Sequence, residues 1–200
     1  MIIPFFLNFE DGERCGATLK SIFENAVNPD KVYIGLVEQN APDDNFCIET
    51  YCNSYAESQI YQRKTIRKGM VKLISQNEGR IHCPYFNNIK LIAYHHIQAH
   101  GPSYARSLTR KVLGNEEFCM QVDAHTKFVN NWDKIALDEW KSANNEFGVL
   151  STVPPSVRDE EKYRVDGEFQ FAVPRQCAIN FQDNGFPVSF PYFHIVWKFR

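Results

Sequence analysis

Short apolar runs that end at polar residues recur along the chain, which is the pattern of buried strands whose ends open into loops. The predicted strands cover residues 2–8, 32–37, 89–94, 117–122 and 148–152. Between the first two, apolar residues return at steps of four, three, one and three, as they do on one face of a helix. These residues are Cys15, Leu19, Ile22, Phe23 and Ala26. Strand, helix and strand fit one right-handed crossover, so we expect a mainly parallel α/β sheet of the nucleotide-binding kind.

The middle of the chain is less regular. Residues 40–69 lose the periodicity, and we expect a long excursion there with one helix around residues 55–64. Residues 70–74 are a further strand candidate, which either forms a hairpin with the strand at 89–94 or lies beside it in the sheet. A helix is predicted from Gly101-Pro102, with the proline at an early position, to Gly114.

Asp123 and His125 follow the apolar run at 118–122, at the predicted carboxyl end of a strand. In open α/β sheets, ligands bind outside the carboxyl ends of the strands. Two positions apart on an extended chain, the carboxylate and the imidazole lie on the same side. Such a pair suits Mn²⁺ or Zn²⁺ and leaves positions open for the phosphate oxygens of a substrate. The alternative is a loop aspartate beside a solvated histidine.

Arg106 is predicted near the amino end of the helix that precedes Asp123. Free N–H donors, the helix dipole and a forked guanidinium all favour an anion such as phosphate, and the alternative is a surface arginine. Asn8, Glu10 and Glu38 stand at the predicted ends of the first two strands, where a nucleotide-binding sheet faces the base and the ribose.

Composition narrows the classes of function. The 200 residues suit one α/β domain, and with 44% hydrophobic residues and a net charge of −2 neither disorder nor a polyanion-binding surface is indicated. Nucleic acid is therefore not expected as a partner. One cluster of basic residues is interpreted as a solvated loop or helix, with contact to nucleic acid or membrane as the alternative. Its members are Arg63, Lys64, Arg67, Lys68 and Lys72.

The six cysteines show no C-x-x-C pair, so a zinc module is not supported. Cys119 is predicted to be buried, and Cys47 and Cys52, which flank a loop, could pair in an oxidising compartment. The first nine residues lack a basic leader and fall short of the roughly 20 residues of a membrane helix. We therefore expect no membrane segment and a cytoplasmic protein, or a Golgi protein if an amino-terminal anchor is missing.

Three histidines crowd a predicted loop: His95, His96 and His100. Their close neighbours include no carboxylate to complete a metal cluster, so a metal site there is not favoured.

The run from Gly101 to Arg106, followed a helix later by the run from Gln121 to Asp133, resembles glycosyltransferase family 60. Its members are N-acetylglucosaminyltransferases that modify hydroxyproline on a cytosolic Skp1-type protein. The opening resembles the same family in order and spacing through residues 18–26, Pro29, residues 32–39, Asp44, Cys47 and Cys52. The likeness covers about residues 1–155. The chain is more distantly similar to the polypeptide N-acetylgalactosaminyltransferases, which hold Mn²⁺ with an Asp-x-His at the corresponding strand end.

The resemblance implies a single GT-A domain over residues 1–200, with a Rossmann-like, mostly parallel sheet. It also implies a UDP-sugar donor, GlcNAc as the sugar, and a hydroxyl acceptor on a protein, such as a Skp1-like one. Asp123 and His125 would hold a divalent cation, Mn²⁺ or Mg²⁺, and Arg106 would help to stabilise the leaving diphosphate. Asn8, Glu10 and Glu38 would complete the nucleotide-sugar site. Relatives retain the anomeric configuration, and no general base is identified.

Residues 156–200 depart from the family pattern, since its paired-Glu motif is missing, so this part is either divergent or truncated. The third metal ligand is not identified by the sequence. His194 is a candidate, and the alternative is that this histidine is simply part of an aromatic-rich terminal strand. Two other classes of function also stay open. One is an inactive paralogue that acts as a binding module, and the other is a divalent-metal phosphoester hydrolase that uses the same Asp123 and His125.

Overall fold

The computed structural model describes residues 2–55, 61–66, 70–75, 83–150, 164–165, 168–169, 174–181 and 187–194, with side-chain burial for residues 10–55 and 83–150. The chain divides into two compact units, Met1–Leu137 and Asp138–Arg200.

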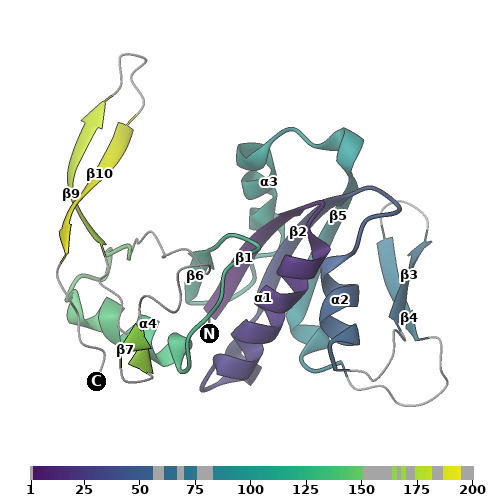
Figure 1. The fold of residues 1–200 in the computed structure, drawn as a ribbon, viewed down its shortest axis with the longest axis horizontal. Coiled ribbons are helices and arrows are strands. Elements are labelled where there is room, and N and C mark those ends of the chain that lie inside the picture. Colours follow the sequence, from purple (N-terminus) through teal and green to yellow (C-terminus); the bar gives the residue numbers. More distant parts are fainter. Residues whose placement is uncertain are drawn as a thin grey trace. The chain divides into compact units, whose positions relative to one another are not determined.

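The first unit is built on a four-stranded parallel sheet in the order β5-β2-β1-β6 (Figure 1). Its strands are β1 (Ile2–Phe9), β2 (Ile34–Asn40), β5 (Ile89–His95) and β6 (Phe118–Gln121). Phe5 of β1 pairs with Gly35 on one side and with Gln121 on the other. Because all four strands are parallel, their carboxyl ends point to the same edge of the sheet. Four of the five predicted strands and the parallel α/β sheet are thus confirmed.

Helices cover both faces of this sheet. The helices α1 (Gly12–Asn25) and α2 (Cys47–Asn53) lie on one face, where Ile34 and Leu36 of β2 join the main core. On the other face, Val37 packs with residues of α3 (Pro102–Leu108). Successive side chains of a strand point to opposite faces, so β2 is buried on both sides. In the described part of the chain, 3-10 helices connect the elements at η1 (Pro29–Lys31), η2 (Phe86–Asn88), η3 (His96–Gln98) and η4 (Thr109–Lys111).

The excursion after β2 differs from the prediction. The helix of this excursion is α2, which ends before residue 55. The stretch at 55–64, predicted to be helical, instead contains the start of β3 (Tyr61–Ile66). This strand pairs with β4 (Met70–Ser75) in an antiparallel hairpin. The aromatic and β-branched residues of β3 favour a strand over a helix. The strand predicted at 70–74 is present as β4, but it pairs with β3 and not with the strand at 89–94. The basic residues Arg63, Lys64 and Lys72 lie on this hairpin, while the other two lie outside the described residues.

Two disulfides tie α2 to its surroundings. Cys15 of α1 is bonded to Cys47, and Cys52 is bonded to Cys83, so the suggested pairing of Cys47 with Cys52 is wrong. Gly12 and Gly16 permit the close approach of the two helices, because a Cβ at either position would meet the backbone or side chains of residues 45–51. These cross-links and close contacts fix α2 against α1.

Cys119, predicted to be buried, is exposed. It lies on the edge strand β6, where Phe118 and Met120 pack against the core. Because Cys119 alternates with them, its side chain points to the opposite face of the sheet.

The second unit begins within α4 (Trp132–Ser142) and continues into two short and two longer strands among its described residues. These are β7 (Arg164–Val165), β8 (Glu168–Phe169), β9 (Pro174–Phe181) and β10 (Pro187–His194), paired as two antiparallel hairpins. The prediction of a strand at 148–152 is wrong for residues 148–150, which form no strand, and the side chains of Val149 and Leu150 are exposed. Residues 151–152 lie outside the described residues. The terminal strand considered as the setting of His194 is present.

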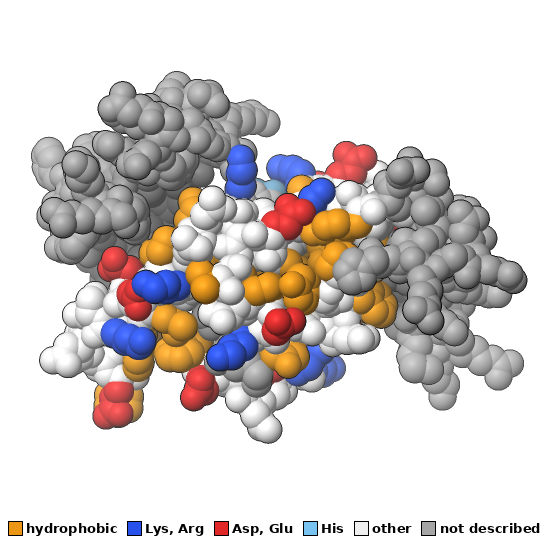
Figure 2. Space-filling view, turned by 90° about the horizontal axis from the view of Figure 1, so that it is seen from below, with side chains coloured by type: hydrophobic (Ala, Val, Ile, Leu, Met, Phe, Trp, Pro, Cys, Tyr) orange, Lys and Arg blue, Asp and Glu red, His pale blue; other side chains and the backbone are white. Residues whose placement is uncertain are grey.

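The surface of the described residues is mixed. Figure 2 shows hydrophobic side chains in a broken band between charged side chains of both signs. Among the residues that the structure describes, no helix combines the length and the apolar character that crossing a membrane would need.

Candidate active site

The loop after β6 holds the predicted metal ligands. Asp123 and His125 lie just beyond the carboxyl end of the strand, and both are exposed. Ala124 and His125 form a turn, so the expectation that both side chains share one side of an extended chain is wrong. The hydroxyl of Thr126 donates to the carbonyl oxygen of Asp123 over 2.8 Å and closes this turn locally. A turn allows two side chains to converge, but their relation is no longer set by strand alternation.

Helix α1 anchors this loop at several points. The Thr18 hydroxyl donates to the carbonyl oxygen of Ala124 over 2.9 Å, in a buried hydrogen bond between residues 106 positions apart. Farther along, the Phe128 N–H donates to Ser21 Oγ over 3.1 Å, and Asn25 Nδ2 donates to the Phe128 carbonyl over 2.9 Å. The loop therefore follows the helix and does not depend on its own turn alone.

Side chains of the same loop enter the core. Ala124, Phe128 and Trp132 are all buried in the main cluster, and the Trp132 indole N–H donates to the Ile22 carbonyl over 2.9 Å. Trp132 thus packs in the core. Asp133, also buried, accepts hydrogen bonds from the backbone N–H groups of residues 27 and 28. The exposed Asp123 and His125 thus lie on a loop that is held in the core by Ala124 between them and by Phe128 and Trp132 after them.

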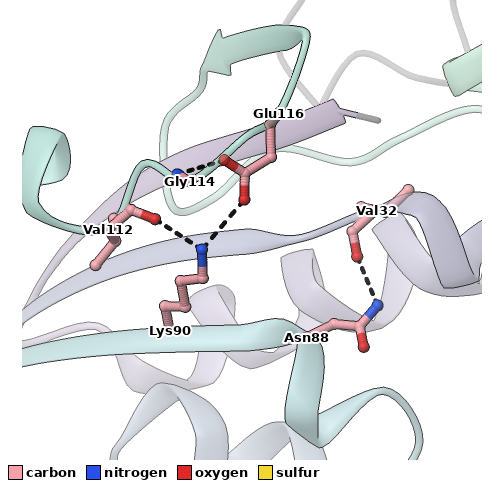
Figure 3. Close-up of polar contacts among 6 residues, drawn as sticks. All are labelled: Val32, Asn88, Lys90, Val112, Gly114 and Glu116. Atoms are coloured by element: carbon pink, nitrogen blue, oxygen red, sulfur yellow. Dashed lines mark hydrogen bonds and ion pairs between the residues drawn. The ribbon is translucent and has the colours of Figure 1, made fainter.

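The segment that joins α3 to β6 is held by a buried carboxylate (Figure 3). The Glu116 carboxylate lies 3.1 Å from Lys90 Nζ and accepts the N–H of Gly114, while Lys90 Nζ also donates to the Val112 carbonyl. Burial raises the pKa of Glu116, but hydrogen bonds from its own N–H and from Gly114, together with the Lys90 ammonium, outweigh burial and hold the pKa below 4.5. This ion pair fixes the chain between Arg106 and Asp123.

Arg106 does not lie where the sequence placed it. It is in the last turn of the seven-residue α3 and is exposed, so the argument from a helix amino terminus does not apply to it. In the described part of the chain, no hydrogen bond or ion pair joins Arg106 to Asp123 or His125. What remains is an exposed guanidinium, free to pair with an anion.

Glu38 serves the fold. The strand β2 continues to Asn40, so Glu38 does not end it, and the residue is only 1% exposed. Its Oε1 accepts the N–H of Cys47, the first residue of α2, over 2.7 Å. A carboxylate at a helix amino terminus is stabilised by the free N–H groups there. This contact with the α2 backbone, which occupies the carboxylate, argues against direct contact between Glu38 and a nucleotide.

Gln39 was missed by sequence reasoning. It is 5% exposed and alternates with Glu38, so it faces the side of the sheet that α3 covers. Among the described residues, its Nε2 has no hydrogen-bond partner. Buried polar atoms without partners are uncommon and call for an explanation. In the sequence, only its position next to the predicted end of a strand indicated that Gln39 could belong to the site.

The end of β1 is linked to the end of β5. Glu10 Oε1 lies 2.7 Å from His96 Nδ1, and the Glu10 N–H donates to Asn40 Oδ1 over 3.3 Å. The carboxylate that seemed to be missing beside the histidines is thus supplied by a distant residue. Asn8 pairs in register with Glu38, and its side chain lies outside the description.

The described residues contain no group of three histidine, cysteine, aspartate or glutamate side chains arranged to hold a metal ion. Asp123 and His125 offer one carboxylate and one imidazole, a donor set that suits Mn²⁺ when substrate oxygens supply the other ligands.

Residues 6–189 match the model of a protein family described as "Glycosyltransferase (GlcNAc)". The chain belongs to this glycosyltransferase family. The match contains the anchored loop with Asp123 and His125, as well as Glu10 and Arg106. It supports a transferase that uses a sugar donor, as the sequence predicted. No curated protein and no solved structure matches this member of the family.

Proposed function

We propose that this protein is a metal-dependent glycosyltransferase with a GT-A fold. It transfers GlcNAc from a UDP-sugar to a hydroxyl group on a protein. The observation that supports this most strongly is the family match across a loop that carries an exposed Asp-x-His and follows a strand of a parallel sheet. In such sheets, ligands bind outside the carboxyl ends of the strands.

Asp123 and His125 would hold Mn²⁺ or Mg²⁺. A bound divalent cation supplies positive charge for the diphosphate that leaves during transfer. Arg106 pairs its guanidinium with the same diphosphate, because the planar fork of donors fits phosphate oxygens. Thr18 holds the backbone between the two metal ligands, so that little freedom has to be lost when the donor binds.

Asn8 and Glu10 lie at or beside the carboxyl end of β1 and are assigned to the nucleotide. Gln39 takes the place that sequence reasoning gave to Glu38, since Glu38 binds the backbone of α2 whereas the Gln39 amide has a donor to offer. A carbonyl of the base is a suitable acceptor for that donor.

The disulfides support a proposal about the compartment. Four cysteines are bonded in two pairs, and such bonds form and persist mainly in oxidising compartments. A cytosolic Skp1-like acceptor would instead place the protein in a reducing one. We favour an oxidising compartment such as the Golgi, which was the alternative expectation, and with it a protein acceptor that passes through the same compartment.

The test is an assay of UDP-GlcNAc turnover with and without Mn²⁺. The transferase releases UDP only with the metal, and Asp123→Asn abolishes this release. Asp30→Asn is the matched control, because it makes the same change at an exposed aspartate of η1, which precedes β2 at the amino edge of the sheet.

The same assay separates the two alternative functions. Release of inorganic phosphate from the phosphoester UMP, without any sugar acceptor, would instead identify a phosphoester hydrolase. Absence of turnover, with UDP binding that does not respond to metal, would identify a binding module.

A further inference from the structure

Glu10 and His96 form a dyad at the carboxyl edge of the sheet. Glu10 follows β1 and His96 opens η3 after β5, so the contact joins residues 86 positions apart. A carboxylate only accepts hydrogen bonds, so the imidazole nitrogen that faces it, Nδ1, carries the proton and donates. The dyad therefore fixes both the direction of the carboxylate and the tautomer of the ring.

The backbone beneath the carboxylate is also fixed. Glu10 has a φ of 52°, in the left-handed region that residues other than glycine rarely adopt. Its N–H is held by Asn40 Oδ1, and Asn40 in turn donates from Nδ2 to the Asn45 carbonyl over 2.9 Å. Strained backbone that its surroundings hold in place is concentrated at binding sites. A side-chain contact this exposed adds little to stability, whether or not the imidazole is charged, so stability alone does not explain this arrangement.

The dyad still has capacity for a ligand. The side chains of Glu10 and His96 are 41% and 32% exposed. An ionised carboxylate offers about four lone-pair positions, of which His96 uses one. Among the described residues, Glu10 Oε2 has no hydrogen-bond partner. Two neighbouring hydroxyl groups on one ligand would satisfy the free positions together, and acidic residues in nucleotide-binding sheets accept hydrogen bonds from ribose hydroxyls in this way.

We propose that Glu10 binds the 2′,3′-diol of the donor's ribose and that His96 is the residue that positions its carboxylate. This inference rests on the proposed function, because the ligand is the nucleotide of the sugar donor. Glu10 touches the substrate, whereas His96 acts through Glu10. The consequence is a preference for ribonucleotides over 2′-deoxyribonucleotides that depends on both residues.

The test measures the dissociation constants of UDP and 2′-deoxy-UDP by calorimetry in the presence of Mn²⁺. The wild-type protein should bind UDP at least about tenfold more tightly, the effect expected from one hydrogen bond to a charged group. Glu10→Gln should reduce this ratio to about two or less. His96→Leu should also reduce it, and His96→Asn should restore it, since the asparagine amide places a donor near the position of Nδ1.

His100→Leu is the control, because it removes another exposed histidine from the same region, whose ring packs edge-on against Tyr104. It should leave the ratio unchanged, and thermal unfolding of each variant separates a loss of folding from a loss of selectivity. Equal binding of both nucleotides by the wild type, or an unchanged ratio in His96→Leu, would overturn the inference alone. A wild-type protein that binds neither nucleotide would overturn the proposed function as well.

Discussion

Thr18→Val tests whether α1 holds the loop of the proposed metal ligands in place. Valine has nearly the volume of threonine but no hydroxyl, so the packing of α1 is kept while the hydrogen bond to Ala124 is lost. The Ala124 carbonyl is then buried without this donor. The perturbation removes a buried hydroxyl and leaves the exposed side chains of Asp123 and His125 themselves unchanged.

The size of the effect follows from burial. A buried acceptor that loses its donor costs about 1–3 kcal/mol in the free energy of unfolding. For a chain of this size, each kcal/mol lowers the melting temperature by roughly 2–4 °C. Thr109→Val is the matched control, since its hydroxyl also donates to a carbonyl, that of Arg106, but in an exposed helix end. Its free energy of unfolding should stay within about 0.5 kcal/mol of the wild type.

Denaturant unfolding measures the stability, and UDP titration with and without Mn²⁺ measures the consequence for the site. Thr18→Val should bind UDP more weakly with Mn²⁺ and about as well as the wild type without it, because the loop that holds the metal is loosened. Equal stability losses in Thr18→Val and Thr109→Val would refute the energetic argument. Full Mn²⁺-dependent binding in a destabilised Thr18→Val protein would refute the anchoring role.

Three further predictions concern the frame around the site. Glu38→Ala should lower the free energy of unfolding by about 1.5–3 kcal/mol, the cost of losing a hydrogen bond to a charged group. Glu13→Ala, on the exposed side of α1, is the control and should change the free energy of unfolding only slightly. Equal losses of stability in denaturant unfolding of the two variants would contradict this. The pKa of Glu116 is lowered in the fold, so its contribution to stability is present above pH 4.5 and is lost as the pH falls below that value; the stability difference between wild type and Glu116→Gln should therefore shrink in acid, and a constant difference would contradict the ion pair. Six cysteines less the four in disulfides leave at most two thiols to titrate in the denatured, unreduced protein, and reduction should destabilise it by about 3–4 kcal/mol per disulfide; six titratable thiols would contradict the cross-links.

The central sheet could be predicted because its strands are short, continuous apolar runs buried on both faces. The strand β4 was also predicted, but β3 and its pairing with β4 were not, because the charged residues of β3 hide the strand pattern and its polar surroundings suggest a helix or loop. Val149 and Leu150 show the opposite failure, since an apolar run was taken for a strand although these side chains are exposed. Local hydrophobicity identifies a strand only where a partner strand and a covering layer exist.

Only part of the candidate site could be predicted from the sequence. Asp123 and His125 are separated by one residue, so a local motif indicates them, and the end of their strand was located correctly. The hydrogen bond from Thr18 to Ala124 joins residues 106 positions apart, and the contact between Glu10 and His96 joins residues 86 positions apart. A local sequence pattern cannot indicate contacts between residues so distant in the chain. Arg106 was placed at the wrong end of its helix, because α3 ends at Leu108 and gives way to η4.

The most direct test of the central claim is a calorimetric titration of UDP into wild type, Asp123→Asn, Arg106→Ala and the double variant, with and without Mn²⁺. The wild type should bind UDP more tightly with the metal, and Asp123→Asn should abolish this dependence. Arg106→Ala should keep the dependence and weaken binding by about 1.5–3 kcal/mol, and the double variant should lose less than the sum because both groups act on one diphosphate. Undiminished Mn²⁺ dependence in Asp123→Asn would contradict the assignment of Asp123 as a metal ligand.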